Sequence, residues 1–315
     1  MTDEHAATGP RSPETGGRES GGGLIEPTEH RRRLAAVLLG LREAAGLNQT
    51  DFGARGGMNQ SKVSRLETAR QVPTLADANA WAEAAGIDAP ARERLRERVE
   101  AALNETVSMA EYVRHGVAHR QRQIGAQERA VSIERNVCIA IVPGLLQTAE
   151  YTRRQFELAD ILHPELAADG PASLAAWAER QHVLYEPDHR FEFVVTEAAL
   201  RWRPGPDGHP RVLVTQLRHI ASVSTLANVR FGVIPWRTAM RSCPTHGFII
   251  YGEPGADPDV WVHTSTKTST LDFRDPNEIA VYRRMWDLLC ADAVFGDDAR
   301  VEIERIIAEL HTEQP

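Results

Sequence analysis

Apolar residues in the first third of the chain recur at helical spacing. The segment 29–45 carries such a stripe, formed by Leu34, Val37, Leu38 and Leu41. Gly46 follows where a helix would end. Further segments with helical texture are 49–57, 60–68, 73–86 and 90–104. Five short helices in succession predict a compact all-α domain over residues 25–104.

The pattern changes twice after this domain. Residues 105–130 are rich in Arg, His and Gln ("RHGVAHRQRQ") with little apolar periodicity, which predicts a solvated connecting helix or linker. Residues 131–315 alternate strand-like segments with helical ones: "CIAIVPGLLQ", "FEFVVTE", "VRFGVIP", "GFIIYGE" and "DVWVHTS". The strands from 229 to 273 follow one another directly, so we expect an α+β domain with a mainly antiparallel sheet.

The first 24 residues contain Gly, Ser and Pro but no apolar run, which predicts a disordered tail. They lack the apolar core of a signal peptide, and no stretch of about 18 apolar residues follows, so we expect a cytoplasmic protein without membrane contact. The three cysteines are far apart and form no CxxC motif, which favours free thiols over a disulfide framework or a zinc finger. We expect no metal and no cofactor.

The charge is distributed unevenly along the chain. The net charge is −8, of which residues 1–24 carry −2, residues 25–90 carry zero and residues 91–315 carry −6. Within 42–70, five cations stand against three anions. A mildly basic segment on an acidic protein points to the helices of 42–70 as the part that meets a polyanion.

The predicted helix 60–68 has two chemically distinct faces. Val63 and Leu66 fall on one side of a helical wheel, and a polar arc formed by Gln60, Ser61, Ser64 and Arg65 falls on the other. Amide, hydroxyl and guanidinium groups read base edges in the major groove of DNA. The arc therefore predicts a reading head, and the alternative is a solvated face of a helical bundle.

The glycines before this helix fit the same interpretation. Gly53 removes a side chain where the next helix would cross closely, and Gly57 supplies the positive φ of a tight turn.

These residues resemble the lambda-repressor-like, XRE-type helix-turn-helix regulators over roughly 31–86. The matching positions are Leu47, Asn48, Gln49, Gly53, Gly57 and the helix from Gln60. The resemblance implies that Gln49 contacts a DNA phosphate, that residues of the third helix reach the bases, and that Arg42 and Glu67 form a structural pair. The DNA-binding set expected on these grounds is Gln49, Asn59, Gln60, Ser61, Lys62, Ser64 and Arg65. Lys62 lies beside the arc, where we expect a phosphate contact.

The C-terminal part has a resemblance of its own. "IVPGLLQTAEYTRR" at 141–154, with "TEAALRW" and "VTQLRHI" further on, resembles the second domain of actinomycete XRE regulators described as antitoxin-like. We interpret the 141–154 segment as architectural, since Pro143-Gly144 makes a turn and a helix follows. The resemblance covers about 133 to the C-terminus.

Catalysis has no persuasive motif in this domain. The histidines lack ligand spacing, and there is no nucleophile elbow, Walker loop or HExxH motif. The tryptophans Trp177, Trp202, Trp236, Trp261 and Trp286 fit either a ligand pocket or separate core positions.

We therefore expect a regulator that binds double-stranded DNA as a homodimer on a two-fold operator. One alternative is an antitoxin-like module that holds a small partner protein, and another is an enzyme with a DNA-binding appendage.

Overall fold

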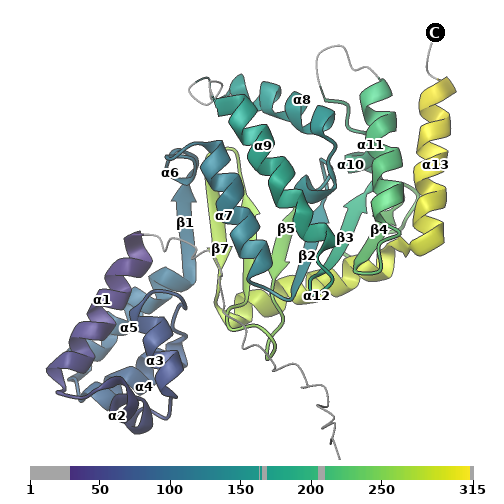
Figure 1. Cartoon of the computed structure of the whole chain (residues 1–315). Helices are drawn as coiled ribbons and strands as arrows, with labels where there is room; N and C mark the ends of the chain where they lie inside the picture. Colours follow the sequence, from purple (N-terminus) through teal and green to yellow (C-terminus); the bar gives the residue numbers. More distant parts are fainter. Residues whose placement is uncertain (1–28, 163, 165–168, 205–209, 313–315) are drawn as a thin grey trace, which may run out of the picture.

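The computed structural model describes residues 29–162, 164, 169–204 and 210–312 of the chain (Figure 1). The tail expected over residues 1–24 lies outside the described residues. The N-terminal part is all-α, as the hydrophobic period predicts, and its helices are α1 (Glu29–Ala44), α2 (Gln49–Arg55), α3 (Gln60–Glu67), α4 (Leu75–Ala85) and α5 (Ala89–Leu103).

A small apolar core holds these five helices together. The ring of Phe52 packs on that of Trp81 with centroids 4.7 Å apart, and Val63 and Leu66 of α3 are buried against them. The indole N–H of Trp81 donates to the carbonyl of Leu38 at 3.2 Å, which satisfies its one polar group. The helix starts are capped by side chains of the preceding residues, Asn48, Asn59, Thr74 and Asp88.

The C-terminal part is built on one sheet of eight strands. Its strands are β1 (Asn104–Ser108), β2 (Ile133–Cys138), β3 (Arg190–Thr196), β4 (Val229–Ile234), β5 (Phe248–Tyr251), β6 (Trp261–Ser265), β7 (Ser269–Phe273) and β8 (Val294–Phe295). Their order in the sheet is β1-β7-β6-β5-β2-β3-β4-β8. Most neighbours are antiparallel, but β2, β3 and β4 are parallel to one another.

The strand around Val229 differs from the expectation in its pairing. We expected it to begin an antiparallel run that ends near Phe273, but β4 pairs in parallel with β3, and only β5, β6 and β7 form an antiparallel meander. The physical reason is the helical crossovers between β2, β3 and β4, which return each strand in the same direction.

Helices cover both faces of this sheet (Figure 1). The helices are α6 (Met109–Tyr112), α7 (Val117–Arg129), α8 (Ala149–Asp160), α9 (Gly170–Arg180), α10 (Glu197–Arg201), α11 (Pro210–Val223), α12 (Pro276–Asp292) and α13 (Gly296–Thr312), with short 3₁₀ turns η1 (Gly144–Leu146) and η3 (Gln181–Tyr185). Trp286 of α12 packs on Val194 and Val262 on one face, and Leu217 of α11 and Ile303 of α13 pack on Phe193 on the other.

Residues 105–130, expected to connect the domains as a solvated helix, are part of the sheet domain. β1 begins directly where α5 ends and pairs with β7 at the edge of the sheet. Helix α7 packs against α9, and its Glu128 is only 1% exposed. Glu128 forms a buried ion pair with Arg180 of α9. Hydrophobic periodicity does not reveal this contact, because both residues are charged.

Candidate DNA-binding surface and C-terminal cavity

Two glycines allow α3 to cross α2 closely. A Cβ at Gly53 would lie 2.6 Å from the carbonyl oxygen of Met58, which no side chain tolerates. Gly57 has φ +66°, in the left-handed region that favours glycine. Both roles agree with the expectation from sequence. The turn sets α3 on α2 so that Val63 and Leu66 are buried and the opposite face is open.

The open face of α3 carries the polar residues expected there. Asn59 caps the helix by accepting a hydrogen bond from the backbone N–H of Lys62 at 2.8 Å. Gln60 and Ser61 are exposed, and Ser64 and Arg65 are half-buried. The Arg65 guanidinium bonds to Ser61 Oγ at 2.8 Å and to Gln71 Oε1 at 3.0 Å, so its orientation is fixed before any partner arrives. We call Gln60, Ser61, Ser64 and Arg65 together the DNA-reading face, after the role that the sequence predicts for them.

A chain of hydrogen bonds between side chains joins this face to the interior of the domain. Arg42 Nε lies 2.5 Å from Glu67 Oε1, Gln49 Nε2 donates to the other Glu67 oxygen at 2.8 Å, and Gln60 Nε2 donates to Gln49 Oε1 at 2.7 Å. The structure thus brings together Arg42 and Glu67 as the pair implied by the resemblance. It also positions Gln49 between that pair and the DNA-reading face.

Lys62 makes a contact within the domain that the sequence did not predict. Its Nζ lies 2.6 Å from Asp77 Oδ1, and the side chain of Asp77 is 9% exposed. The same carboxylate accepts the backbone N–H of Thr74 in the capping box at the start of α4. Lys62 therefore ties α3 to α4, and its phosphate contact stays a prediction.

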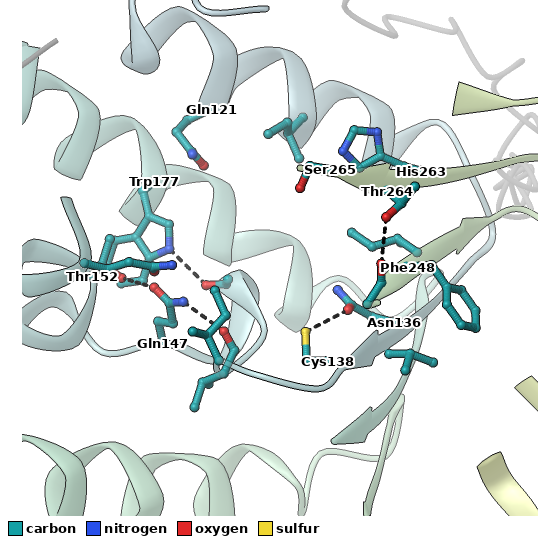
Figure 2. A pocket seen from close by; sticks show the side chains of 18 of the residues that line it. Gln121, Asn136, Cys138, Gln147, Thr152, Trp177, Phe248, His263, Thr264 and Ser265 are labelled. Carbon is teal, nitrogen blue, oxygen red and sulfur yellow. Dashed lines mark hydrogen bonds between the residues drawn. The ribbon is translucent and has the colours of Figure 1, made fainter. Parts of the chain in front are cut away.

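The sheet domain contains a cavity of about 490 Å³ over strands β2, β5 and β6. Helices α7, α8 and α9 and the loop after β2 border it, and Figure 2 shows many of the side chains that line it. Gln121 reaches in from α7, Trp177 from α9, and Asn136 and Cys138 form part of its floor on β2. The volume is in the range of small-molecule sites, which span roughly 300–1,000 Å³.

Buried ionisable groups lie next to the cavity. Arg180, which lines it, bonds to both oxygens of Glu128 at 2.5–2.9 Å and to Gln121 Oε1 at 3.0 Å. Glu134 is 1% exposed, and its burial, followed by repulsion from the carboxylate of Glu128, raises its pKa to about 8. A buried carboxyl with this pKa is mostly protonated near neutral pH.

The thiol of Cys138 packs against the protein core and is poorly suited to act as a nucleophile. Burial raises its pKa to about 12, with a further contribution from Glu134, and the thiol lies 3.3 Å from Asn136 Oδ1. A nucleophilic cysteine needs a lowered pKa so that the thiolate forms near neutral pH. Within the described residues, no group of three or more His, Cys, Asp and Glu side chains is arranged to hold a metal ion.

Sequence reasoning missed most residues of this cavity. The segment 141–154, interpreted as architectural, buries Leu145, Leu146 and Tyr151, but its Gln147 and Thr152 line the cavity and bond to each other at 2.8 Å. Trp177 lines the cavity, with its N–H on the carbonyl of Gly144 at 3.0 Å. The other tryptophans weighed as pocket residues lie elsewhere: Trp202, Trp261 and Trp286 pack in or against core clusters, and Trp236 is exposed.

Comparison with known families places this domain. The family model "Domain of unknown function (DUF5753)" matches residues 121–305, which is more than half of the chain. The chain belongs to that family. A second model, described as a helix-turn-helix domain, matches residues 33–95, the part that contains α2 and α3. Neither the curated proteins nor the solved structures gave a match. Among the described helices, none has the length and apolar character needed to span a membrane.

Proposed function

We propose that the protein is a sequence-specific DNA-binding transcriptional regulator whose helix α3 reads the major groove. The observation that carries this proposal is the DNA-reading face, a set of amide, hydroxyl and guanidinium groups on the side of α3 opposite its buried residues. Each of these groups has a matching base edge in the major groove, with Arg pairing to guanine and Gln to adenine. The match of a helix-turn-helix model over 33–95 supports the same conclusion.

Backbone contacts are expected from the start of α2. The amide of Gln49 has two N–H groups, of which one is used by Glu67, so the second can meet a phosphate at the start of the helix. Asn59 and Ser61 stand at the corresponding end of α3. Such contacts fix the register of the protein on the duplex, and the bases supply the specificity.

We propose that the protein acts as a homodimer on a two-fold operator, with half-sites about 34 Å apart. A single helix-turn-helix offers a small footprint, and the acidic C-terminal domain has no electrostatic reason to approach DNA. That domain exposes apolar side chains, with Trp236 at 73% and Val301 at 64% exposure, each next in the sequence to a member of the ion pair Arg237–Glu302. Their exposure favours assembly through this domain, because a second copy would bury them.

The same exposed side chains support the second candidate, a module that holds a small partner protein. The mass of the purified protein in solution distinguishes the two candidates. The chain alone forms a homodimer, whereas a complex with a partner protein needs that partner. A catalytic function is not proposed, since the thiol in the cavity has a pKa raised to about 12.

Selection of bound sequences from random DNA by the full-length protein tests the proposal. We expect an enriched motif with two-fold symmetry. A variant with Gln60, Ser61 and Arg65 changed to Ala removes the DNA-reading face. The control changes Arg94 and Arg98 to Ala, since both are exposed on α5. The control should keep the motif and the first variant should lose it. Recovery of random sequences by the unchanged protein would contradict the proposal.

A further inference from the structure

The cavity lies where one face of the sheet changes character. The register places Phe193 of β3, Asn136 of β2, Ile249 of β5 and His263 of β6 in one row across that face. On the β3 side of the row, under α11 and α13, the neighbours are apolar. On β2 the same face carries Glu134, Asn136 and Cys138, and on β6 it carries His263 and Ser265. The cavity lies over this polar part of the sheet, and its volume of about 490 Å³ is in the range of small-molecule sites.

The position in the sheet supports the same conclusion. The chain runs from β2 to β3 to β4 in one direction and then returns to the other side of β2 to form β5. The cavity adjoins the carboxyl end of β2, where Cys138 leads into the loop 139–142. Ligands of open α/β sheets bind at such points, because the connections diverge there and leave a crevice.

The lining indicates an uncharged ligand. The described lining residues include no Asp or Glu that could hold an ammonium group. The basic side chains of the lining already have partners in the protein: Arg180 pairs with Glu128, and the ring of His263 lies 2.8 Å from Asp272. Arg120 donates to the neutral amide of Gln123 at 3.1 Å. A ligand carboxylate or phosphate would have to compete with Glu128 and Asp272 for the first two.

Amide and hydroxyl groups make up the rest of the polar surface. They come from several elements around the cavity and include Gln121, Gln127, Asn136, Gln147, Thr152, Gln155, Thr264 and Ser265. Of these, Asn136, Gln147, Thr152 and Thr264 are also hydrogen-bonded within the protein. Gln121 uses its oxygen on Arg180 and keeps its N–H groups as donors, and Trp177 adds an aromatic side chain beside it (Figure 2). Side-chain amides pair with other amides through matched donor and acceptor atoms.

We propose that this cavity binds a small uncharged molecule bearing amide groups, and that its occupancy is transmitted to the helix-turn-helix domain. The chemistry is shared by nucleobases and cyclic dipeptides. The transmitted effect rests on the proposed DNA binding, whereas the binding site itself does not.

A short chain of contacts leads from the cavity to α1. His263 Nδ1 lies 2.8 Å from Asp272 Oδ1 on β7, and Asp272 Oδ2 lies 3.6 Å from Arg31 Nη2 on α1. Arg31 Nε also lies 3.1 Å from Glu105 of β1, which stands opposite Asp272 in the register. The row of residues across the sheet that starts at Phe193 therefore continues through His263 and Asp272. It reaches Arg31 of α1, the first helix of the DNA-binding domain. In this proposal a ligand that contacts His263 changes the contact between Asp272 and Arg31.

Binding is tested on the full chain without DNA. The probes are uridine and cyclo(Ala-Leu), which represent the two sources, each with a charged counterpart, uridine 5′-monophosphate and the linear zwitterion Ala-Leu. Isothermal titration calorimetry should show binding of at least one uncharged probe, with its counterpart at least about tenfold weaker. Ser265→Trp should place a bulky side chain at an exposed position of the lining and abolish binding, and Lys267→Trp, in the exposed hairpin tip nearby, should retain it. If neither uncharged probe binds, or if the charged counterpart binds as tightly, the ligand class is wrong.

Transmission is tested by the operator affinity with and without the probe that binds. The unchanged protein should show a difference of about fivefold or more, in the usual range of allosteric coupling. Asp272→Asn and Arg31→Gln should bind the probe normally but lose this difference, and circular dichroism checks that each folds. Probe binding with unchanged operator affinity in the wild type would overturn the transmission. Absence of DNA binding under all conditions would contradict the proposed function and leave the calorimetric result intact.

Discussion

Glu67 Oε1 lies 2.5 Å from Arg42 Nε, so the end of α3 is tied to α1 through a pair whose acidic side chain is 3% exposed. This contact sets the angle at which the DNA-reading face is presented. Glu67→Ala should lower the free energy of unfolding of the N-terminal domain by about 3–5 kcal/mol, because the Arg42 charge is left without its partner. Thermal melting of a 25–103 fragment measures this.

The control for that change is Glu43→Ala, because Glu43 is exposed on α1 and its loss should shift the melting curve little. If Glu67→Ala left the melting curve unchanged and abolished DNA binding, Glu67 would belong to the DNA interface and not to the fold.

Arg65 is held by Ser61 and Gln71 at the centre of the DNA-reading face. Arg65→Ala should weaken operator binding by about 1–3 kcal/mol and relax the base preference at one position in each half-site. Affinities for the operator and for random DNA give both quantities. Equal weakening on both DNAs, with the preferred sequence unchanged, would show that α3 is not the reader.

Lys62 shows how the structure modifies a sequence expectation. Because its ammonium pairs with Asp77 at 2.6 Å, Lys62→Met should destabilise the N-terminal domain by about 1 kcal/mol and leave the salt dependence of DNA binding unchanged. The measurements are a melting curve and operator affinity across a salt series. A salt slope lower by about one per site, with an unaltered melting curve, would instead support the phosphate contact that the helical wheel indicated.

The N-terminal helices could be predicted closely, and the sheet pairing could not. Local signals define each helix: Asn59 caps α3, and Gly86 ends α4 with φ +68°. Pairing depends instead on contacts between distant segments, so nothing near Val229 shows that β4 lies beside β3.

The cavity could not be predicted from the sequence for a related reason. The segment "IERNVC" places Glu134 and Asn136 on one face of β2 and Ile133 and Val137 on the other, but it does not show whether water or a helix covers the polar face. Lys62 is a similar case, since its partner Asp77 lies 15 residues away on another helix.

Ala69 occupies a backbone position that favours glycine. It follows the cap of α3 with φ 56°, and the N–H of Arg70 donates to the carbonyl of Arg65 at 2.9 Å, which is the Schellman pattern. The left-handed conformation costs alanine about 1–2 kcal/mol, of which the entropy of glycine offsets about 0.5–1 kcal/mol. Ala69→Gly should therefore raise the melting temperature of the 25–103 fragment by a few degrees. Ala80→Gly, inside α4, should lower it. A lower melting temperature for Ala69→Gly would show that packing of its buried methyl outweighs the backbone strain.

Glu134 should make the stability of the C-terminal domain fall as pH rises. Its pKa is raised to about 8 in the folded protein by burial and by the neighbouring carboxylate of Glu128, against about 4.3 in an unfolded chain. Between these two values the folded state holds a proton that the unfolded state has released. The contribution of Glu134 is therefore fully favourable below about pH 4 and is lost progressively up to about pH 8, by at most about 1.4 kcal/mol per pH unit.

Glu134→Gln removes this titration and retains an N–H donor for the carboxylate of Glu128. The difference in unfolding free energy between this variant and the wild type should therefore grow in favour of the variant from pH 5 to pH 8. Chemical denaturation of the full chain at several pH values measures the difference, and Glu304→Gln, at an exposed position of α13, provides the matched change at a solvated carboxyl. A constant difference across this range would mean that Glu134 is ionised in the folded protein, and that Arg180 compensates both buried carboxylates at once.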